Sequence, residues 1–198
     1  VVAAFTGLLV VMVLLWVPES LPAERRHDGG LRILLDGTRE LARDHVLVRL
    51  LFINALSFGL LMAYLSAAPF VLRNVLGMGT VAYTAVFGLC GATVTVTIAV
   101  AASLVRRFSQ ARQVRVGLIA GLVVDTVFAG VCLTWLREPV TGPERMPLLV
   151  AVVALFLAHV ACLGLSMGNA PALALDRTGR WAGTGSALLG FLQFVVGG

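Results

Sequence analysis

The sequence predicts an all-α integral membrane protein, a polytopic bundle of helices. Of its 198 residues, 59% are hydrophobic and only 13% are charged, whereas soluble domains carry about 25% charged residues. The mean hydropathy of +0.97 points the same way. A chain this apolar cannot cover a water-facing surface with polar groups. Helices satisfy every backbone hydrogen bond within one segment, so apolar runs that cross lipid are expected to be helical.

Six apolar runs approach the roughly 20 residues that a membrane-spanning helix needs. They cover Val1 to Val17, Val46 to Ala68, Thr80 to Val105, Val114 to Leu136, Pro147 to Asn169, and Ala182 onward. The first run is already apolar at its first residue, and the last is still apolar at its end. We therefore expect the first helix to be truncated on its N-terminal side and the last on its C-terminal side.

The chain is expected to have three parts: a span over 1–17, a cytoplasmic linker over 18–45, and a transmembrane bundle over 46–198. Prolines at the start of the linker stop the first helix, because proline cannot donate the helical hydrogen bond. From Leu31 to Arg49, leucines alternate with arginines and aspartates. This pattern predicts an amphipathic helix at the membrane interface; a solvated linker helix fits it equally well.

All basic residues of the chain are arginines, and they lie in the connections between the apolar runs. The first, third and fifth connections hold all of them except Arg73, Arg137 and Arg145. Because cytoplasmic loops are enriched in basic residues, these odd connections are predicted to be cytoplasmic. The net charge of +5 is therefore explained by arginines that orient the chain in the membrane. A nucleic-acid partner is not expected, since the arginines do not gather on one face with aromatic residues.

Polar residues recur at helical spacing in three of the runs, so each of these helices has one polar face. Three such faces predict a central cavity with weakly polar walls, which suits an amphiphilic organic substrate better than a small ion. The residues predicted to line this cavity are Asn54, Ser57, Tyr64, His159, Ser166, Asn169 and Gln193.

The fourth run contains Gly117 and Gly121, a spacing that lets helix backbones approach closely in lipid. The same four-residue step reaches Asp125, which therefore faces another helix near the middle of the span. His159 lies at a similar depth on the next, antiparallel helix. An Asp125–His159 pair could relay protons, as ionisable residues inside membranes often do. Alternatively, a neighbouring hydroxyl or carbonyl group satisfies each side chain separately.

Other chemistry receives little support. The cysteines Cys90, Cys132 and Cys162 lie inside apolar runs without a C-x-x-C spacing. They favour packing over a metal site or a disulfide. Residues 164–168 read Gly-Leu-Ser-Met-Gly and match the G-x-S-x-G pattern of hydrolases. That pattern requires a strained strand-to-helix turn. Here it completes a predicted span, where glycine and serine are packing residues, so no enzyme is expected.

A weak internal similarity links residues 65–72 with 165–173, because both segments carry a Leu-Ser pair and then Ala-Pro. The two segments lie three helices apart and would cross the membrane in opposite directions. Inverted three-helix repeats are typical of secondary transporters. Chance similarity between helices rich in alanine and leucine is the alternative.

Several segments resemble one transporter family in order and spacing. The stretch Pro18-Glu19-Ser20-Leu21-Pro22, followed by arginines, resembles the end of helix six in Bcr/CflA-type drug:proton antiporters of the major facilitator superfamily. Residues 64–72 resemble the end of their helix seven, and residues 104–108 their basic loop after helix eight. Residues 168–194 resemble helices ten and eleven and form the most specific part. The six runs would then be helices six to eleven, a partial C-terminal half of the major facilitator fold.

This resemblance implies a transporter that exports hydrophobic drugs or antibiotics across the inner, cytoplasmic membrane in exchange for protons. It implies lipid as surroundings and an N-terminal half as partner, and neither a cofactor nor a metal. A carrier for a sugar or metabolite is the alternative, although its cavity would usually show more Asn, Gln and Trp. A structural membrane protein without cargo is a more remote one.

The sequence also departs from the family. Asp125 is not at a position where the family places a coupling carboxylate. Ser109-Gln110-Ala111 stands in the basic loop where glycine and proline are usual. Residues 176–180 match the Asp-Arg-x-Gly-Arg loop of the superfamily but follow the wrong helix, so we interpret this match as coincidence.

Overall fold

The computed structural model describes residues 2–16, 30–136 and 139–197, which are helical almost throughout and contain no β-strand. The chain divides into two compact units, Val1–Leu35 and Asp36–Gly198, which are treated separately. The first unit contains α1 (Val2–Trp16), a helix of 15 residues. Its large apolar side chains are exposed, with Leu14, Leu15 and Trp16 each more than 70% accessible.

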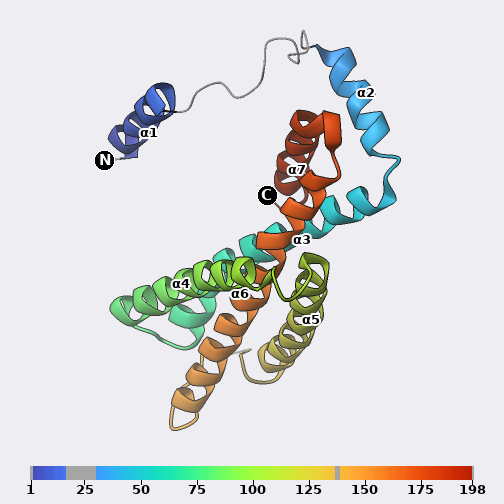
Figure 1. Ribbon diagram of the computed structural model, residues 1–198. Coiled ribbons are helices and arrows are strands. Elements are labelled where there is room, and N and C mark those ends of the chain that lie inside the picture. Colours follow the sequence, from blue (N-terminus) through green and yellow to red (C-terminus); the bar gives the residue numbers. More distant parts are fainter. Residues whose placement is uncertain (1, 17–29, 137–138, 198) are drawn as a thin grey trace. The chain divides into compact units, whose positions relative to one another are not determined.

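The second unit is a helical bundle (Figure 1). Its elements are the end of α2 (Leu31–Leu41), α3 (His45–Pro69), the π-helical turn η2 (Phe70–Val75), α4 (Thr80–Leu104), α5 (Gln110–Trp135), α6 (Arg145–Asp176), the 3₁₀ turn η3 (Gly179–Trp181) and α7 (Ala182–Gly197). All six predicted apolar runs are therefore helical, and the predicted fold class is confirmed.

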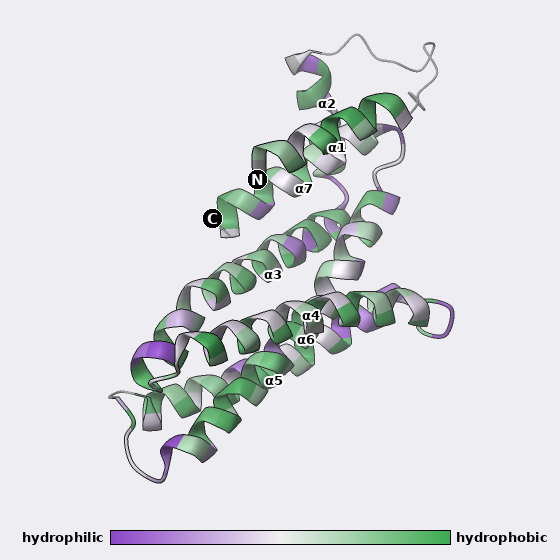
Figure 2. Cartoon of the chain, turned by 90° about the vertical axis from the view of Figure 1, so that its left-hand side faces the viewer, coloured by the Kyte–Doolittle hydropathy of each residue, from purple (hydrophilic) through white to green (hydrophobic). Residues whose placement is uncertain are grey.

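Four of the described helices are long and apolar enough to cross a membrane: α3 with η2, α4, α5 and α6. The helices α1 and α7 have 15 and 16 described residues and are shorter than the usual span. Hydrophobic residues predominate along the long helices, and hydrophilic residues are more frequent near their ends (Figure 2). On α5, Ile119, Leu122 and Val123 are each more than half exposed. Such a surface requires lipid or another protein as its neighbour.

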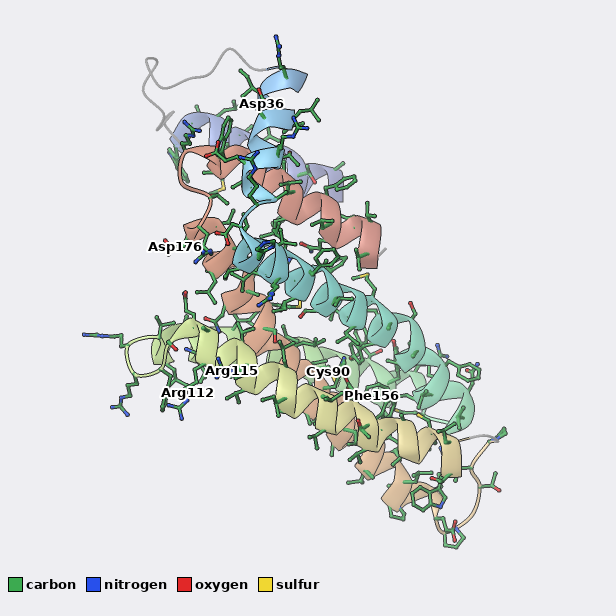
Figure 3. All side chains as sticks on the ribbon, turned by 90° about the vertical axis from the view of Figure 1, so that its right-hand side faces the viewer. Asp36, Cys90, Arg112, Arg115, Phe156 and Asp176 are labelled. Atoms are coloured by element: carbon green, nitrogen blue, oxygen red, sulfur yellow. The ribbon has the colours of Figure 1, made fainter. Side chains whose placement is uncertain are left out.

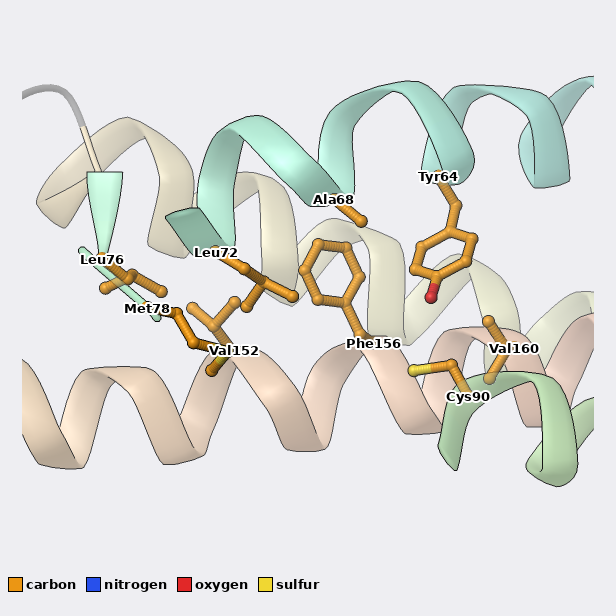
Figure 4. Close-up of a cluster of buried hydrophobic side chains, with 9 residues drawn as sticks. All are labelled: Tyr64, Ala68, Leu72, Leu76, Met78, Cys90, Val152, Phe156 and Val160. Atoms are coloured by element: carbon orange, nitrogen blue, oxygen red, sulfur yellow. The ribbon is translucent and has the colours of Figure 1, made fainter. Parts of the chain in front are cut away.

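Helix α6 is the centre of the second unit, because α3, α4 and α5 all pack against it. The main core cluster joins α6 to α3, η2 and α4 through buried side chains that include Tyr64, Leu72, Cys90 and Phe156. Figure 4 shows the ring of Phe156 reaching from α6 toward Ala68 on α3, with Leu72 and Tyr64 to either side. This core fixes the depth at which the polar residues of α3 and α6 face one another.

Two helices continue beyond the predicted ends at Ala68 and Asn169, through Pro69 and Pro171. Proline normally favours a helix end, because it lacks the N–H group. After Pro69 the backbone widens into η2, where Leu76 N–H donates to the Val71 carbonyl over 3.0 Å. The residues preceding the two prolines, Ala68 and Ala170, are both fully buried. The two segments thus share a buried alanine before the proline, but only the first widens into a π-helical turn after it.

The single helix predicted from Leu31 to Arg49 is wrong, because α2 ends at Leu41 and α3 starts at His45. The reason is Asp44, whose Oδ1 accepts the backbone N–H groups of Val46 (2.9 Å) and Leu47 (3.2 Å). An aspartate that caps a new helix offers the backbone an alternative to continuing the old one. Residues 18–29 of the predicted 18–45 linker lie outside the described residues.

The bundle end with the arginine-rich connections is held by ion pairs between α2, the start of α3 and the segment after α6. Arg177 contacts Asp44 at 2.8 Å, and Arg180 contacts Glu40 at 2.7 Å. Figure 3 places the labelled Arg112, Arg115 and Asp176 at this same end. The Asp-Arg-x-Gly-Arg match at the end of α6 therefore has a structural role here: its arginines pair with Glu40 of α2 and with Asp44, the residue before α3.

The opposite end is held by Arg145, the first residue of α6. Its guanidinium donates to the carbonyl groups of Leu76 (2.8 Å) and Gly77 (2.5 Å). These carbonyls follow the η2 turn, where helix geometry no longer provides donors. Different arginine contacts thus connect the helices at the two ends of the bundle. Between these ends, α3, α5 and α6 border a common pocket.

Candidate functional site

Asp125 on α5 and His159 on α6 are in direct contact. The distance between His159 Nδ1 and Asp125 Oδ1 is 2.6 Å, and the two side chains are 13% and 34% exposed. The sequence left open whether these groups meet or are satisfied separately, and the structure brings them together. Both residues lie well inside their spans, so the contact combines two ionisable groups at membrane depth.

The glycines of α5 bring the two helices close enough for this contact. A Cβ atom added at Gly117 would lie 2.9 Å from the Cys162 carbonyl oxygen and 3.0 Å from Ser166 Oγ. One turn further, a Cβ atom at Gly121 would have an ordinary contact of 3.5 Å with Cys162 Cβ. The tight crossing is therefore at Gly117, two helical turns before Asp125. The close-packing stripe predicted from the glycine spacing is confirmed.

Two adjoining pockets border the pair. One, of about 280 Å³, lies between α3, α5 and α6 and is lined by Ser57, Cys162 and Ser166 together with leucines and the α5 glycines. The other, of about 210 Å³, is lined by aromatic residues of the same three helices. Leu60, Asp125 and His159 border both pockets. Apart from these few polar groups the walls are apolar, a composition typical of sites for organic molecules.

The aromatic pocket has a defined geometry. The rings of Tyr64 and Phe156 meet edge to face with centroids 5.3 Å apart, and Phe128 lies 5.0 Å from Phe156. The Tyr64 ring is 6.1 Å from the imidazole of His159. In Figure 4 the Tyr64 side chain points from α3 across the core cluster toward Val160. Aromatic contacts therefore hold the second pocket beside the ion pair.

The structure brings together only part of the predicted cavity lining. Ser57, Tyr64, His159 and Ser166 border the two pockets beside Asp125. The other three predicted residues, all of them amides, lie elsewhere: Asn54 Nδ2 is 3.5 Å from Gln193 Oε1, between α3 and α7. Asn169 donates to Gln113 Oε1 at 3.3 Å and to the Leu165 carbonyl at 2.9 Å. These amides join helices instead of facing the pockets beside Asp125.

Gln113 was missed by the sequence reading, because the fourth helix was expected to begin only at Val114. It is buried, with 5% of its surface exposed, and holds Asn169. The overlooked signal is Ser109, a residue type that commonly caps helices. Its hydroxyl accepts the Arg112 N–H at 3.4 Å, and α5 begins at Gln110. Because Ser109 caps the helix, α5 starts early enough to include Gln113, whose amide group faces the interior.

The G-x-S-x-G match has no hydrolase geometry. Residues 164–168 lie inside the continuous helix α6, where no strand-to-helix turn exposes Ser166. A Cβ atom added at Gly164 would lie 2.9 Å from Thr97 Cβ, and one at Gly168 would lie 3.4 Å from Ile98 Cγ2. The glycines therefore allow α4 to approach α6, which is the packing role expected from the sequence.

Comparison with known proteins identifies the class. The chain matches the Major Facilitator Superfamily over residues 1–198, and it belongs to this superfamily. It is similar to an uncharacterized MFS-type transporter, YdgK of Bacillus subtilis (strain 168), with 24% identity over 194 residues. This match covers 96% of the chain and 44% of the relative, so the chain spans less than half of the relative's length. No solved structure matches the chain significantly.

Membership of this superfamily and four apolar helices of membrane length together indicate a multi-pass membrane protein. The family match assigns the helices to the major facilitator fold, which their length and composition alone do not show. It does not by itself distinguish between cargoes, which have to be argued from the pockets and the ion pair beside them.

Proposed function

We propose that the complete protein is a secondary active transporter that exports hydrophobic, drug-like compounds across the cytoplasmic membrane in exchange for protons. The observation that carries this proposal is the Asp125–His159 pair, in direct contact at 2.6 Å beside a largely apolar pocket. Ionisable residues inside membrane spans are costly and rare, and they commonly belong to ion or proton pathways.

The pair has the chemistry needed to take up and release a proton. A neutral imidazole can accept a second proton, and an adjacent carboxylate stabilises the resulting imidazolium. The side chain of Asp125 is partly open to the pocket, and that of His159 is largely enclosed. Protons and cargo would therefore act on the same small region, an arrangement that allows their movements to be coupled.

The pocket walls support a hydrophobic cargo better than a sugar. Leucines and aromatic rings form most of the lining. Sugar binding would call for several free amide side chains, yet Asn54, Asn169 and Gln193 hydrogen-bond with protein groups. The export direction and the inner membrane rest on the resemblance to drug:proton antiporters, and the arginine distribution supports only the orientation of the helices.

We further propose that an N-terminal half of the same transporter completes the cavity. Major facilitator proteins consist of two related six-helix halves that rock around a central site. The matched region covers 44% of the relative, which is about the share that one half would occupy.

The test uses the complete protein in proteoliposomes with an imposed proton gradient and a fluorescent hydrophobic dye. We expect gradient-driven dye movement, and we expect Asp125→Asn and His159→Gln to abolish the part that depends on the gradient. Asp176→Asn is the matched control, because this carboxyl group is outside both pockets. Unchanged gradient-driven transport in the Asp125 and His159 variants would refute coupling at this pair. Transport of sugars but of no hydrophobic dye would refute the proposed cargo.

A further inference from the structure

We propose that His159 Nε2, together with the hydroxyl group of Ser57, is the recognition point for a hydrophobic ligand that carries an N–H or O–H donor. A proton competes with this ligand for the same nitrogen. The inference rests on the proposed function only in taking the pocket ligand to be the transported cargo. The group that the pocket selects is the N–H or O–H donor of the ligand, and the atom that selects it is His159 Nε2.

Asp125 determines which nitrogen of His159 is free to accept a hydrogen bond. An ionised carboxylate only accepts hydrogen bonds, so the nitrogen that faces it, Nδ1, must carry the proton. In the neutral imidazole the other nitrogen, Nε2, then has a lone pair and acts as an acceptor. The ion pair thus fixes the tautomer and presents an acceptor on the far side of the ring.

This acceptor is buried and has no protein partner. Within the part of the chain that the structure describes, His159 Nε2 and Ser57 Oγ are both buried side-chain atoms without a hydrogen bond. Ser57 is only 1% exposed, and both residues line the pocket of about 280 Å³. Buried polar atoms are nearly always paired, so two unpaired ones in one pocket indicate a site whose partner comes from outside the protein.

The remaining lining sets the class of ligand. Leu60, Leu118 and Leu163 contribute apolar surface to this pocket, and the aromatic pocket with Phe128 and Phe156 adjoins it. A ligand that fits is largely apolar or aromatic, with one donor directed at Nε2. Primary and secondary amines attached to aromatic systems have this character. Their fully N-alkylated analogues keep the apolar part but lose the donor.

Protonation of His159 inverts this recognition. A proton added at Nε2 turns the acceptor into a donor, so a ligand N–H group loses its partner. The contact between Nδ1 and Asp125 can stay in place, because Nδ1 carries a proton in both states. The other titratable groups facing His159 are Tyr64 from α3 and Cys162 on α6 itself, while Cys90 from α4 lies against Tyr64. The ligand and the proton therefore exclude one another at one atom.

The test compares two dyes that differ in four N-methyl groups: tetramethylrhodamine methyl ester, which has no N–H donor, and the same dye with N–H groups in place of the N-methyl groups. Both are lipophilic monocations with one skeleton. Their binding to the complete protein in lipid nanodiscs is measured by fluorescence anisotropy across a pH series. At neutral to mildly alkaline pH we expect the unmethylated dye to bind about fivefold more tightly, the size of one net hydrogen bond. This preference should disappear as acidification protonates the imidazole.

Variants separate a contact from a merely structural role. His159→Gln should remove the pH dependence of the preference, and Ser57→Ala should weaken the preference. In Asp125→Asn the amide can face Nδ1 with either of its atoms, so the tautomer is no longer fixed and the donor preference should shrink. Ser103→Ala is the control for loss of a hydroxyl, because Ser103 Oγ donates within its own helix to the Val100 carbonyl.

The location of the bound dye is checked through Cys162, which lines the pocket, in a background where Cys90 and Cys132 are alanine. The unmethylated dye should slow alkylation of Cys162 by a maleimide. Equal binding of the two dyes at every pH, an unchanged pH dependence in His159→Gln, or absence of binding by both dyes would each overturn the inference. These are binding measurements, so a failure of proton-driven export leaves their outcome readable.

Discussion

The close crossing of α5 and α6 gives a sharp prediction about two glycines on one helix. Replacing Gly117 with alanine places a Cβ atom 2.9 Å from the Cys162 carbonyl oxygen and 3.0 Å from the Leu165 Cβ. Both are at or close to the backbone and cannot rotate away, so the helices must separate. At Gly121 the added Cβ meets Cys162 Cβ at 3.5 Å, an ordinary van der Waals distance. Gly121→Ala is therefore a matched control.

The magnitude follows from comparing the two variants. Each gains helix propensity, because alanine is favoured over glycine by about 0.5–1 kcal/mol in a helix interior. This contribution cancels in the difference between them. What remains is the cost of overpacking at Gly117, which for a well-packed interior is about 1–3 kcal/mol. Gly117→Ala should therefore be less stable than Gly121→Ala by about that amount.

The assay is reversible unfolding of the purified protein in mixed micelles, with helicity followed as the fraction of denaturing detergent rises. We expect Gly121→Ala to match or slightly exceed the parent protein and Gly117→Ala to unfold earlier. Because the crossing also positions Asp125 against His159, Gly117→Ala should lose proton-driven dye transport more strongly than Gly121→Ala. Equal stability of the two variants would show that α5 and α6 do not cross at Gly117, and the reasoning would fail.

Two further predictions concern the ends of the bundle. The hydrogen bond from Arg180 lowers the pKa of Glu40 below its ordinary value, so this contact is fully formed above the usual glutamate range and is lost as the pH falls through the lowered pKa. The fluorescence of Trp181, with the other tryptophans replaced by phenylalanine, should change in that acid range, and Glu40→Gln should remove the transition; a transition that persists would contradict it. Arg145→Met should destabilise the bundle by about 1–2 kcal/mol in the same micelle assay, because two carbonyl groups lose a charged donor. Arg112→Met is the control, and equal stability of the two variants would contradict the prediction.

Much of the fold could be predicted from the sequence, because lipid restricts the choices of the chain. Apolar runs of span length must be helical, and all six were found as helices. Where the prediction failed, a local hydrogen bond decided the outcome. Asp44 divided one predicted helix into two by capping the second. The wide turn after Pro69 allowed a helix to continue where proline suggested its end.

The candidate site was predicted less completely. Helical spacing shows which residues share a face, and it placed Ser57, His159 and Ser166 on faces that meet at one pocket. It cannot show whether a polar residue faces a cavity or the side chain of a neighbouring helix. Asn54 and Asn169 lie on the predicted faces, yet they hydrogen-bond with Gln193 and Gln113. That choice depends on how far one helix is shifted along another.

By itself the sequence determined that this chain belongs in a membrane, that its residues 1–198 contain six apolar runs, and that an acid and a histidine lie at a similar depth. These properties follow from composition and periodicity, which act along a single helix. Only the tertiary structure decided that Asp125 touches His159, that Nε2 has no partner among the described residues, and that the amides form hydrogen bonds elsewhere. These contacts depend on the rotation and shift of packed helices, which are set by close approaches such as that at Gly117.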